Sequence, residues 1–235
     1  MQSYTYPGQE LEFFEKAVYW KTYFSSMLKP YIGESVLEVG SGIGATTSLL
    51  NDGQAKRWLL LEPDEQLNKI LDKKIRINSR FENCVLKQAT IHDLSQDESF
   101  DTIIYIDVLE HIRDDKKEMQ KAASLLKSNG HLLILSPANE FLFSPFDKAI
   151  GHYRRYNRST LTAIIPLQLK KISLRYLDSV GYFASLANKL ALQQKYPTEK
   201  QIRIWDRWMI PVSKLTDKIF FHSFGKSILG IWRKE

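Results

Sequence analysis

The 235-residue sequence predicts an α/β protein with a doubly wound, mostly parallel sheet. Short apolar runs alternate with segments of helical periodicity as far as residue 136, which is typical of parallel strands joined by crossover helices. Three glycines follow the first apolar run, and acidic residues stand at the ends of several of the other apolar runs. Both features are expected where the carboxyl ends of parallel strands form a ligand-binding edge.

The first part of the chain is divided by its periodicity and its boundary residues. Apolar residues at helical spacing predict a helix over 10–29 that stops at Pro30, so residues 1–30 form an N-terminal helical segment. Strands are expected near 35–39, 57–61, 83–87, 100–106 and 131–136. Helices are expected near 44–51, 64–74 and 114–127, and the Asn129-Gly130 turn is expected to end the last of them.

The second part is expected to complete the sheet and to carry a helical insert. Residues 137–158 contain prolines and aromatic residues without periodicity, which indicates a long loop at the carboxyl edge of the sheet. A helix from Ser159, a strand near 170–177 and a last strand near 226–233 follow. Residues 181–224 are too numerous for a hairpin and strongly apolar, so they predict helices inserted before that strand. We expect one domain over residues 1–235.

The segment 36–45 is the most informative, because it joins an apolar strand to Gly40, Gly42 and Gly44. Glycines at this spacing allow a tight turn and a close approach of the backbone to a ligand. The same segment fits a dinucleotide pattern, so the glycines alone leave NAD and FAD open. Glu38 argues against them, because a carboxylate at the strand end would repel a pyrophosphate. It would favour S-adenosylmethionine (SAM), which has no phosphate and carries an ammonium and a sulfonium.

A second carboxylate, Glu62, ends the next apolar run about 18 residues after Gly44, near the spacing expected of a ribose-binding acid. Such a residue can accept hydrogen bonds from both ribose hydroxyls. Pro63 closes the strand, and Asp64 is predicted to cap the helix that follows.

Together with residues 100–112 and 125–135, these segments resemble the class I SAM-dependent methyltransferases, a Rossmann-like family, over about residues 30–180. The resemblance implies SAM as cofactor and a single sheet finished by two strands that pair antiparallel. It places the adenine against the loop after the third strand, where Thr90, Ile91 and Asp93 compete for its polar edge; Asp93 could instead cap a turn. It places Asp107 beside the methionine moiety. The cofactor-binding residues are then Glu38, Gly40, Gly42, Gly44, Glu62, Pro63, Thr90, Ile91, Asp93 and Asp107.

Asp107, Glu110 and His111 follow the fourth strand within five residues and resemble the E-x-x-E-H element of metal-dependent O-methyltransferases, with Asp107 in place of the first Glu. In those enzymes a further histidine follows the fifth strand, and His152 has a comparable place. The resemblance implies a divalent metal such as Mg²⁺ on these four residues, which would lower the pKa of an acceptor hydroxyl. Two alternatives stay open. His111 or His152 acts as a general base without metal, or the acid and imidazole satisfy backbone groups or orient the cofactor.

The acceptor is expected in the loop over 137–158, where Tyr153, Arg154, Arg155 and Tyr156 combine guanidinium groups with aromatic faces. The alternative is that an arginine ties the loop to a helix end or an internal carboxylate. For the insert over 181–224 three roles are open: helices packed on the core or on a second subunit of a homodimer, a lid over an apolar or lipid-linked acceptor, or a peripheral membrane contact.

We therefore expect an O-methyltransferase acting on a small molecule or on a glycan-like or lipid-linked acceptor. An N- or C-methyltransferase and a SAM-binding scaffold without catalysis are the alternatives, and a dehydrogenase remains open from the glycines alone. The net charge of +6 is spread over the chain, and without an RNA-binding module nucleic acid is not an expected partner. The absence of a signal-peptide pattern predicts a cytoplasmic protein. Cys84, the only cysteine, excludes an internal disulfide and is expected to be buried.

Overall fold

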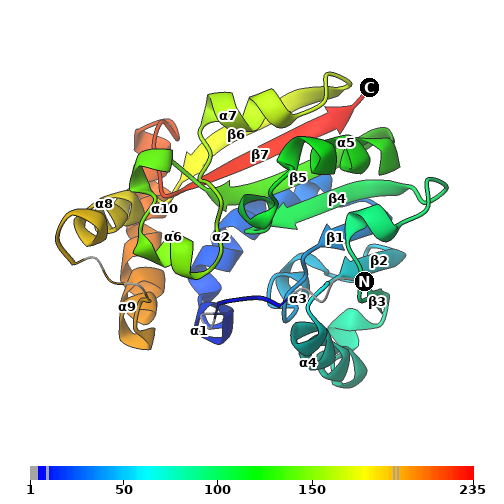
Figure 1. Ribbon diagram of the computed structural model, residues 1–235, viewed down its shortest axis with the longest axis horizontal. Helices are drawn as coiled ribbons and strands as arrows, with labels where there is room; N and C mark the ends of the chain where they lie inside the picture. Colours follow the sequence, from blue (N-terminus) through cyan, green and yellow to red (C-terminus); the bar gives the residue numbers. More distant parts are fainter. Residues whose placement is uncertain (1–4, 9–10, 193, 195) are drawn as a thin grey trace.

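The computed structural model describes residues 5–8, 11–192, 194 and 196–235 and contains one seven-stranded sheet of order β3-β2-β1-β4-β5-β7-β6 (Figure 1). The strands are β1 Ser35–Val39, β2 Arg57–Leu61, β3 Cys84–Lys87, β4 Phe100–Ile106, β5 Leu126–Pro137, β6 Leu169–Leu177 and β7 Ser227–Lys234. β7 pairs antiparallel with both β5 and β6, and the remaining pairs are parallel. The predicted fold class is confirmed.

Helices cover both faces of the sheet, with α5 and α7 on one side and α2 and α10 on the other (Figure 1). The helices are α1 Leu11–Glu15, α2 Val18–Leu28, α3 Thr47–Leu50, α4 Glu65–Ile77, α5 Asp115–Leu125, α6 Pro145–Ala149, α7 Arg158–Ile164, α8 Ser179–Ala187, α9 Glu199–Ile204 and α10 Ile210–Ile219. Two π-helical segments, η6 Asn188–Leu192 and η7 Trp205–Met209, follow α8 and α9. Among the described residues, no helix combines the length and apolar character that crossing a membrane requires.

The core lies on both faces of the sheet because successive side chains of a strand point to opposite sides. Leu37 and Ile103 face the layer of α5 and α7, whereas their neighbours Val36 and Ile104 face the layer of α2 and α10, and all four are fully buried. Strands buried on both faces read as continuous apolar runs, which is why they could be recognised in the sequence. Burial of each such side chain stabilises the fold by about 1.5–3 kcal/mol.

The N-terminal helix expected over 10–29 is broken, since α1 ends at Glu15 and α2 begins at Val18. Asp206, from the helical insert, accepts hydrogen bonds from the backbone N–H groups of Tyr19 (3.2 Å) and Trp20 (2.8 Å). These amides belong to the first turn of α2, where intrahelical acceptors are missing. A carboxylate distant in sequence therefore caps α2 and supports a separate helix start.

Other parts of the chain also differ from the sequence prediction: the loop expected over 137–158 contains the short helix α6, and α4 extends to Ile77. α3 is limited to Thr47–Leu50, because the glycine turn extends further than expected. The Asn129-Gly130 turn does not end α5: β5 begins directly at Leu126, and Asn129 lies inside that strand with φ 64°. The pairing of β5 with β4 shifts register at this point, so the turn residues form a bulge rather than a helix end.

The insert before β7 is helical, as predicted, and packs on the core. Asp217 of α10 accepts the backbone N–H groups of Asp178 and Ser179, each at 2.8 Å, at the start of α8. The hydroxyl of Tyr23 in α2 donates to the same carboxylate at 2.9 Å. Because Asp217 is fully buried, these bonds satisfy a charge that would otherwise be costly and fix the insert against α2.

Candidate functional site

A cavity of about 600 Å³ lies at the carboxyl ends of β1, β2 and β4. The strand order reverses beside β1, which is where open α/β sheets bind ligands. Of the residues predicted from the sequence, those that line it are Glu38, Gly40, Gly42, Glu62, Pro63, Thr90, Ile91, Asp107, Glu110, His111, His152 and Arg155. The N-terminal segment, the loop after β5 and the helical insert supply the other walls.

The glycine turn leaves β1 in a conformation that other residues adopt rarely. Gly40, Gly42 and Gly44 have φ of 67°, 53° and 74°. A Cβ at Gly40 would lie 2.6 Å from a methyl carbon of Val108, so this glycine also permits a close packing. Gly44 does not line the cavity. A Cβ at this position would lie 2.6 Å from a methyl carbon of Leu71, so Gly44 permits close packing on the side of the turn away from the cavity.

Glu38 lies at the end of β1 and is almost completely buried, with 3% of its surface exposed. Its Oε2 accepts the indole N–H of Trp58 at 2.9 Å. Burial raises the pKa of Glu38 to about 7, against the opposing effect of that hydrogen bond. A cation in the cavity would favour the charged form of this carboxyl and is the ligand that the site suits.

Glu62 joins the two turns that follow β1 and β2. Its Oε2 accepts the N–H of Gly42 at 2.7 Å, and its Oε1 accepts the N–H of Asp64 at 2.9 Å. Burial raises the pKa of Glu62 to about 7 despite these bonds. Asp64 caps α4, as predicted, by accepting the N–H groups of Gln66 and Leu67, both at 2.8 Å.

The loop after β3 presents Thr90 and Ile91 to the cavity but not Asp93. The Oδ2 atom of Asp93 accepts the backbone N–H of Thr90 at 2.8 Å and its hydroxyl at 2.7 Å, which closes a short 3₁₀ turn over Ile91–Asp93. Asp93 therefore has the capping role that the sequence left open. Of the three residues expected to contact the polar edge of the adenine, only Thr90 and Ile91 line the cavity.

Asp107 closes β4 with its backbone in the left-handed region, at φ 54°. Its side chain is exposed, but only toward the cavity, so that the cavity walls surround it with protein atoms. Burial raises the pKa of Asp107 to about 6, while the charges of His152, Lys226 and Lys21 act in the opposite direction. The carboxylate thus lies among basic groups at the floor of the cavity.

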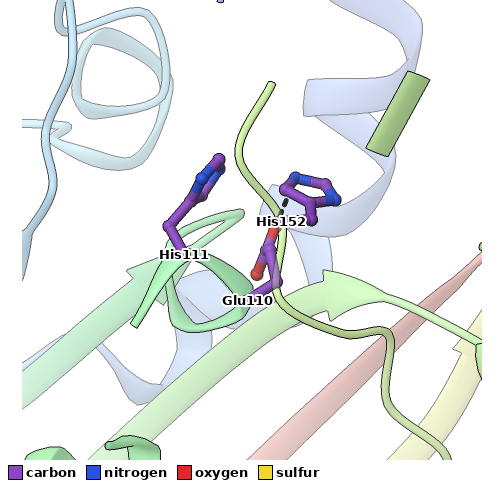
Figure 2. A group of neighbouring side chains, drawn as sticks. All are labelled: Glu110, His111 and His152. Carbon is purple, nitrogen blue, oxygen red and sulfur yellow. Dashed lines mark ion pairs between the residues drawn. The ribbon is translucent and has the colours of Figure 1, made fainter. Parts of the chain in front are cut away.

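Glu110, His111 and His152 form one cluster beside Asp107 (Figure 2). One potential ligand atom from each lies within 4.8 Å of the other two, and the imidazole rings are 4.5 Å apart between centroids. Glu110 Oε2 accepts the hydroxyl of Ser136 at 2.9 Å, whereas Glu110 Oε1 and His111 Nδ1 are buried without a hydrogen-bond partner among the described residues. Asp107 does not belong to this cluster, so the four-residue metal set expected from the sequence reduces to three.

Asp147, which the sequence did not single out, orients His152. Its Oδ1 lies 2.9 Å from His152 Nδ1, so that Nε2 faces Glu110 Oε1 at 3.7 Å. The guanidinium of Arg155 donates to both oxygens of Asp147, at 2.8 and 2.9 Å. Burial acts to raise the pKa of Asp147, but the hydrogen bond with His152 and the charge of Arg155 outweigh it and hold this pKa well below its usual range. Burial acts to lower the pKa of His152, but Asp147 and Glu110 outweigh it and raise this pKa. Burial lowers the pKa of His111 to about 3.

The expected acceptor residues have mostly structural roles. The guanidinium of Arg154 pairs with Asp115 at the start of α5, and the hydroxyl of buried Tyr156 donates to Asp115 at 2.8 Å. Tyr153 is exposed and lies outside the cavity lining. Arg155 does line the cavity, but an internal carboxylate occupies its guanidinium. The alternative that these arginines tie the loop to a helix end and an internal carboxylate is therefore the one observed.

Several cavity residues were missed because their own segments carry no motif. Lys21 donates to the backbone oxygens of Phe14 and Glu15, and burial lowers its pKa to about 8. The ammonium of Lys226 lies 4.4 Å from the ring centroid of Trp205, with no acceptor or ion-pair partner in the described part of the chain. Burial lowers the pKa of Lys226. Only the position of Lys226 directly before the last strand could have pointed to the edge of the sheet.

Comparison with known proteins identifies the family. A family model described as a methyltransferase domain matches residues 19–184, which is most of the chain. The chain belongs to the class I SAM-dependent methyltransferases. SAM is accordingly the cofactor of this methyltransferase, and the match decides against the dinucleotide enzymes that the glycines had left open.

Curated relatives of the methyltransferase are distant. Demethylmenaquinone methyltransferase of Tropheryma whipplei is 29% identical over 169 residues, which cover 71% of this chain and 65% of the relative. The chain spans about half to two thirds of the length of the curated relatives it matches.

Solved structures agree with the architecture of the methyltransferase. Geranyl diphosphate methyltransferase in complex with SAM matches with a TM-score of 0.63 at 10% identity, covering 91% of this chain and 85% of the other. The N-methyltransferase NodS of Bradyrhizobium japonicum in complex with S-adenosylhomocysteine matches with a TM-score of 0.58 at 16% identity, covering 94% and 87%. At these identities the likeness establishes the Rossmann-like fold.

Proposed function

We propose that this methyltransferase transfers the methyl group of SAM to a hydroxyl group of a small-molecule, glycan-like or lipid-linked acceptor. The observation that carries the proposal is the Asp147–His152 pair, which points an imidazole nitrogen toward Glu110 in the same cavity as Glu38 and Asp107. The sulfonium of SAM is already an activated donor, so the protein must mainly align the reactants. A hydroxyl acceptor also needs a base, and this is what the pair supplies.

In the proposed reaction the acceptor oxygen attacks the methyl carbon of SAM, and the bond between carbon and sulfur breaks to leave S-adenosylhomocysteine. The hydroxyl proton passes to His152 Nε2 in the neutral form of the imidazole, which carries its proton on Nδ1 against Asp147, and the raised pKa of His152 favours the imidazolium that results. Asp147 holds the other ring nitrogen, fixes the tautomer and stabilises the imidazolium that forms. Asp147 is therefore a positioning residue, and Arg155 keeps it charged in a buried place.

A divalent cation is a second means of activating the hydroxyl at the same cluster. Glu110 Oε1 and His111 Nδ1 lack hydrogen-bond partners among the described residues, and a neutral His111 is the form that binds metal. Two imidazoles and one carboxylate suit Mn²⁺, Fe²⁺ or Zn²⁺ better than Mg²⁺, which prefers oxygen ligands. When bound, such an ion would lower the pKa of the acceptor hydroxyl.

The walls of the cavity bear on the class of acceptor. Phe14, Trp20 and Trp205 form an apolar surface above the floor. Lys226 lies over the ring of Trp205 next to that surface, and it has no ion-pair or hydrogen-bond acceptor for its ammonium among the described residues. We therefore favour an acceptor that combines an apolar body with a carboxylate or phosphate, because such a group would compensate the charge of this half-buried ammonium.

The test uses SAM labelled with carbon-13 on the transferred methyl group. The protein is incubated with aqueous and organic extracts of its source cells, and the carbon-13 shift of the product shows whether the methyl group sits on oxygen, nitrogen or carbon. An O-methyl product that disappears with His152→Gln, while SAM binding is kept, supports the proposal. An N- or C-methyl product contradicts it, as does the absence of any product under conditions in which SAM binds, which would indicate a scaffold.

Metal dependence is tested on the same reaction. Dialysis against a chelator followed by addition of Mn²⁺, Zn²⁺ or Mg²⁺ separates the two means of activation. Loss and recovery of activity, matched by metal binding that Glu110→Gln weakens, would assign the cluster to a cation. Full activity in chelator would leave the base to His152 alone.

A further inference from the structure

The helical unit formed by α9, η7 and α10 carries a row of large apolar side chains that face solvent. Ile204, Trp208, Val212, Leu215 and Ile219 are all exposed, Trp208 at 69% and Leu215 at 62%. Their spacing of three or four residues places them on one side of the helix. We call these five residues the outer stripe.

The fold does not need the outer stripe for packing. The opposite side of the same unit already supplies the core with Ile202, Trp205 and Ile210, all buried. An amphipathic helix on a protein surface normally has one apolar side, whereas this unit has two. A contiguous exposed apolar surface of this kind marks a contact with a partner or a membrane.

The apolar surface continues past the end of α10. Phe220 and Phe183 each lie against the ring of Phe224, with centroids 5.4 and 5.9 Å apart. Phe183, from α8, is 59% exposed, and Phe221, next in the chain after Phe220, is 86% exposed. The stripe and this aromatic group thus belong to neighbouring segments of one insert, since α8 and α10 pack together.

Basic residues follow one edge of the stripe. Arg203, Arg207, Lys214 and Lys218 are exposed, and the structure gives them no ion pair with a described residue. The acidic residues within 200–219 are Asp206 and Asp217, and both are buried and bonded to backbone amides. Glu199, the first residue of α9, is also exposed, but it forms an ion pair with Lys16 at 2.8 Å. Over residues 200–219 the exposed side of the unit therefore combines apolar area with positive charge alone.

We propose that the outer stripe and its basic edge dock this protein on the surface of a bilayer that contains anionic phospholipids. An amphipathic helix of this composition lies in the plane of the interface, with its apolar side among the acyl chains and its cations at the headgroups. A second copy of the chain fits less well, because it would bring four more cations to the contact, and the exposed acidic residue of the unit, Glu199, is already paired with Lys16.

Docking through the outer stripe would also fix the distance between the cavity and the membrane. Trp205 lines the cavity from the side of the helix opposite Trp208, so the cavity would lie one helix diameter, about 10 Å, from the bilayer surface. The docking itself does not depend on methyl transfer, so it can fail while the proposed function holds.

The experiment is co-sedimentation of the full chain with vesicles of phosphatidylcholine alone and of phosphatidylcholine with roughly a quarter phosphatidylglycerol. We expect binding to the anionic vesicles that weakens with salt. Trp208 is the exposed tryptophan, since Trp20, Trp58, Trp205 and Trp232 are buried, so binding should also shift the fluorescence to shorter wavelength.

Two variants separate docking through the outer stripe from nonspecific adsorption of exposed apolar residues to vesicles. The double substitution Trp208→Ser with Leu215→Ser should weaken vesicle binding by about tenfold or more, because it removes two apolar anchors. Ile77→Ser, which removes an 85% exposed apolar residue of α4, is the matched control and should bind as the parent does. SAM titration checks that each variant is folded.

Three results would overturn the proposal. One is equal binding to neutral and anionic vesicles, and another is an equal loss in the Ile77→Ser control. The third is a protein that binds no vesicles but is a dimer by light scattering, with the double variant monomeric, which would assign the outer stripe to a second copy.

Discussion

The substitution Glu38→Gln should stabilise the protein without ligand and weaken SAM binding. Burial raises the pKa of Glu38 from 4.5 to about 7. A carboxyl whose pKa is higher in the folded than in the unfolded protein contributes stability that is full below about pH 4.5 and is lost as the pH rises to about 7. Above pH 7 the buried charge therefore costs the fold on the order of 3 kcal/mol. Glutamine carries no such charge, and its amide oxygen can still accept the Trp58 indole N–H.

For SAM binding the expected effect has the opposite sign. A hydrogen bond to a charged group is worth about 1.5–3 kcal/mol, so loss of the carboxylate should weaken SAM binding by roughly 10- to 150-fold at pH 8. In the parent protein, SAM affinity should rise with pH toward about 7, because the cation binds the deprotonated carboxyl. In the Glu38→Gln variant, SAM affinity should rise less with pH, because only the deprotonation of other groups, Glu62 among them, still contributes.

The assay is chemical unfolding without SAM between pH 5 and 8, combined with calorimetric titration of SAM over the same range. Glu82→Gln, an exposed residue outside the cavity lining, is the matched control and should change neither quantity. A Glu38→Gln protein that is less stable than the parent at pH 8, or that binds SAM equally well, would refute the reasoning that this buried acid is kept for the cofactor.

Three further results are expected. Gly40→Ala should abolish SAM binding or folding, since its Cβ would lie 2.6 Å from Val108, whereas Gly42→Ala meets no atom within 4 Å and should cost only about 1–2 kcal/mol of unfolding free energy for its positive φ. Asp206→Ala should lower the free energy of unfolding by about 1–2 kcal/mol through loss of the α2 cap, measured in denaturant; no change would contradict the capping role. Cys84 is half-buried rather than buried as expected, and because burial raises its thiol pKa to about 12, alkylation at pH 8 should be slow until the protein unfolds.

Elements whose causes are local were predicted well. The central strands β1, β2 and β4 are mostly apolar runs because both faces of the sheet are covered there, and a run of this kind is visible without knowing its neighbours. Asp64 was recognised as a helix cap because its partners, Gln66 and Leu67, are two and three residues away. The glycine turn after β1 could be predicted for a similar reason, because the need for glycine there comes from the positive φ of the backbone and not from a distant contact.

The roles of charged side chains were predicted poorly when the partner is distant. Arg154 and Arg155 could bind an acceptor or an internal carboxylate, and their sequence reads the same in either case. Asp147 lies in a short helix without a motif, so its contact with His152 could be found only in the folded chain. The break between α1 and α2 depends on Asp206, which is nearly 190 residues further along.

The places of the strands along the chain, the glycine turn and the acids beside it were thus predicted from the sequence, because strand burial and backbone conformation act over a few residues. Tertiary structure alone decided which imidazole is held by a carboxylate, which cavity cation lacks an ion-pair partner among the described residues, and which apolar side of the insert faces solvent. Each of these depends on the free energy of burying or pairing a group against residues far away in the chain. A local sequence pattern does not show which distant residue will be that partner.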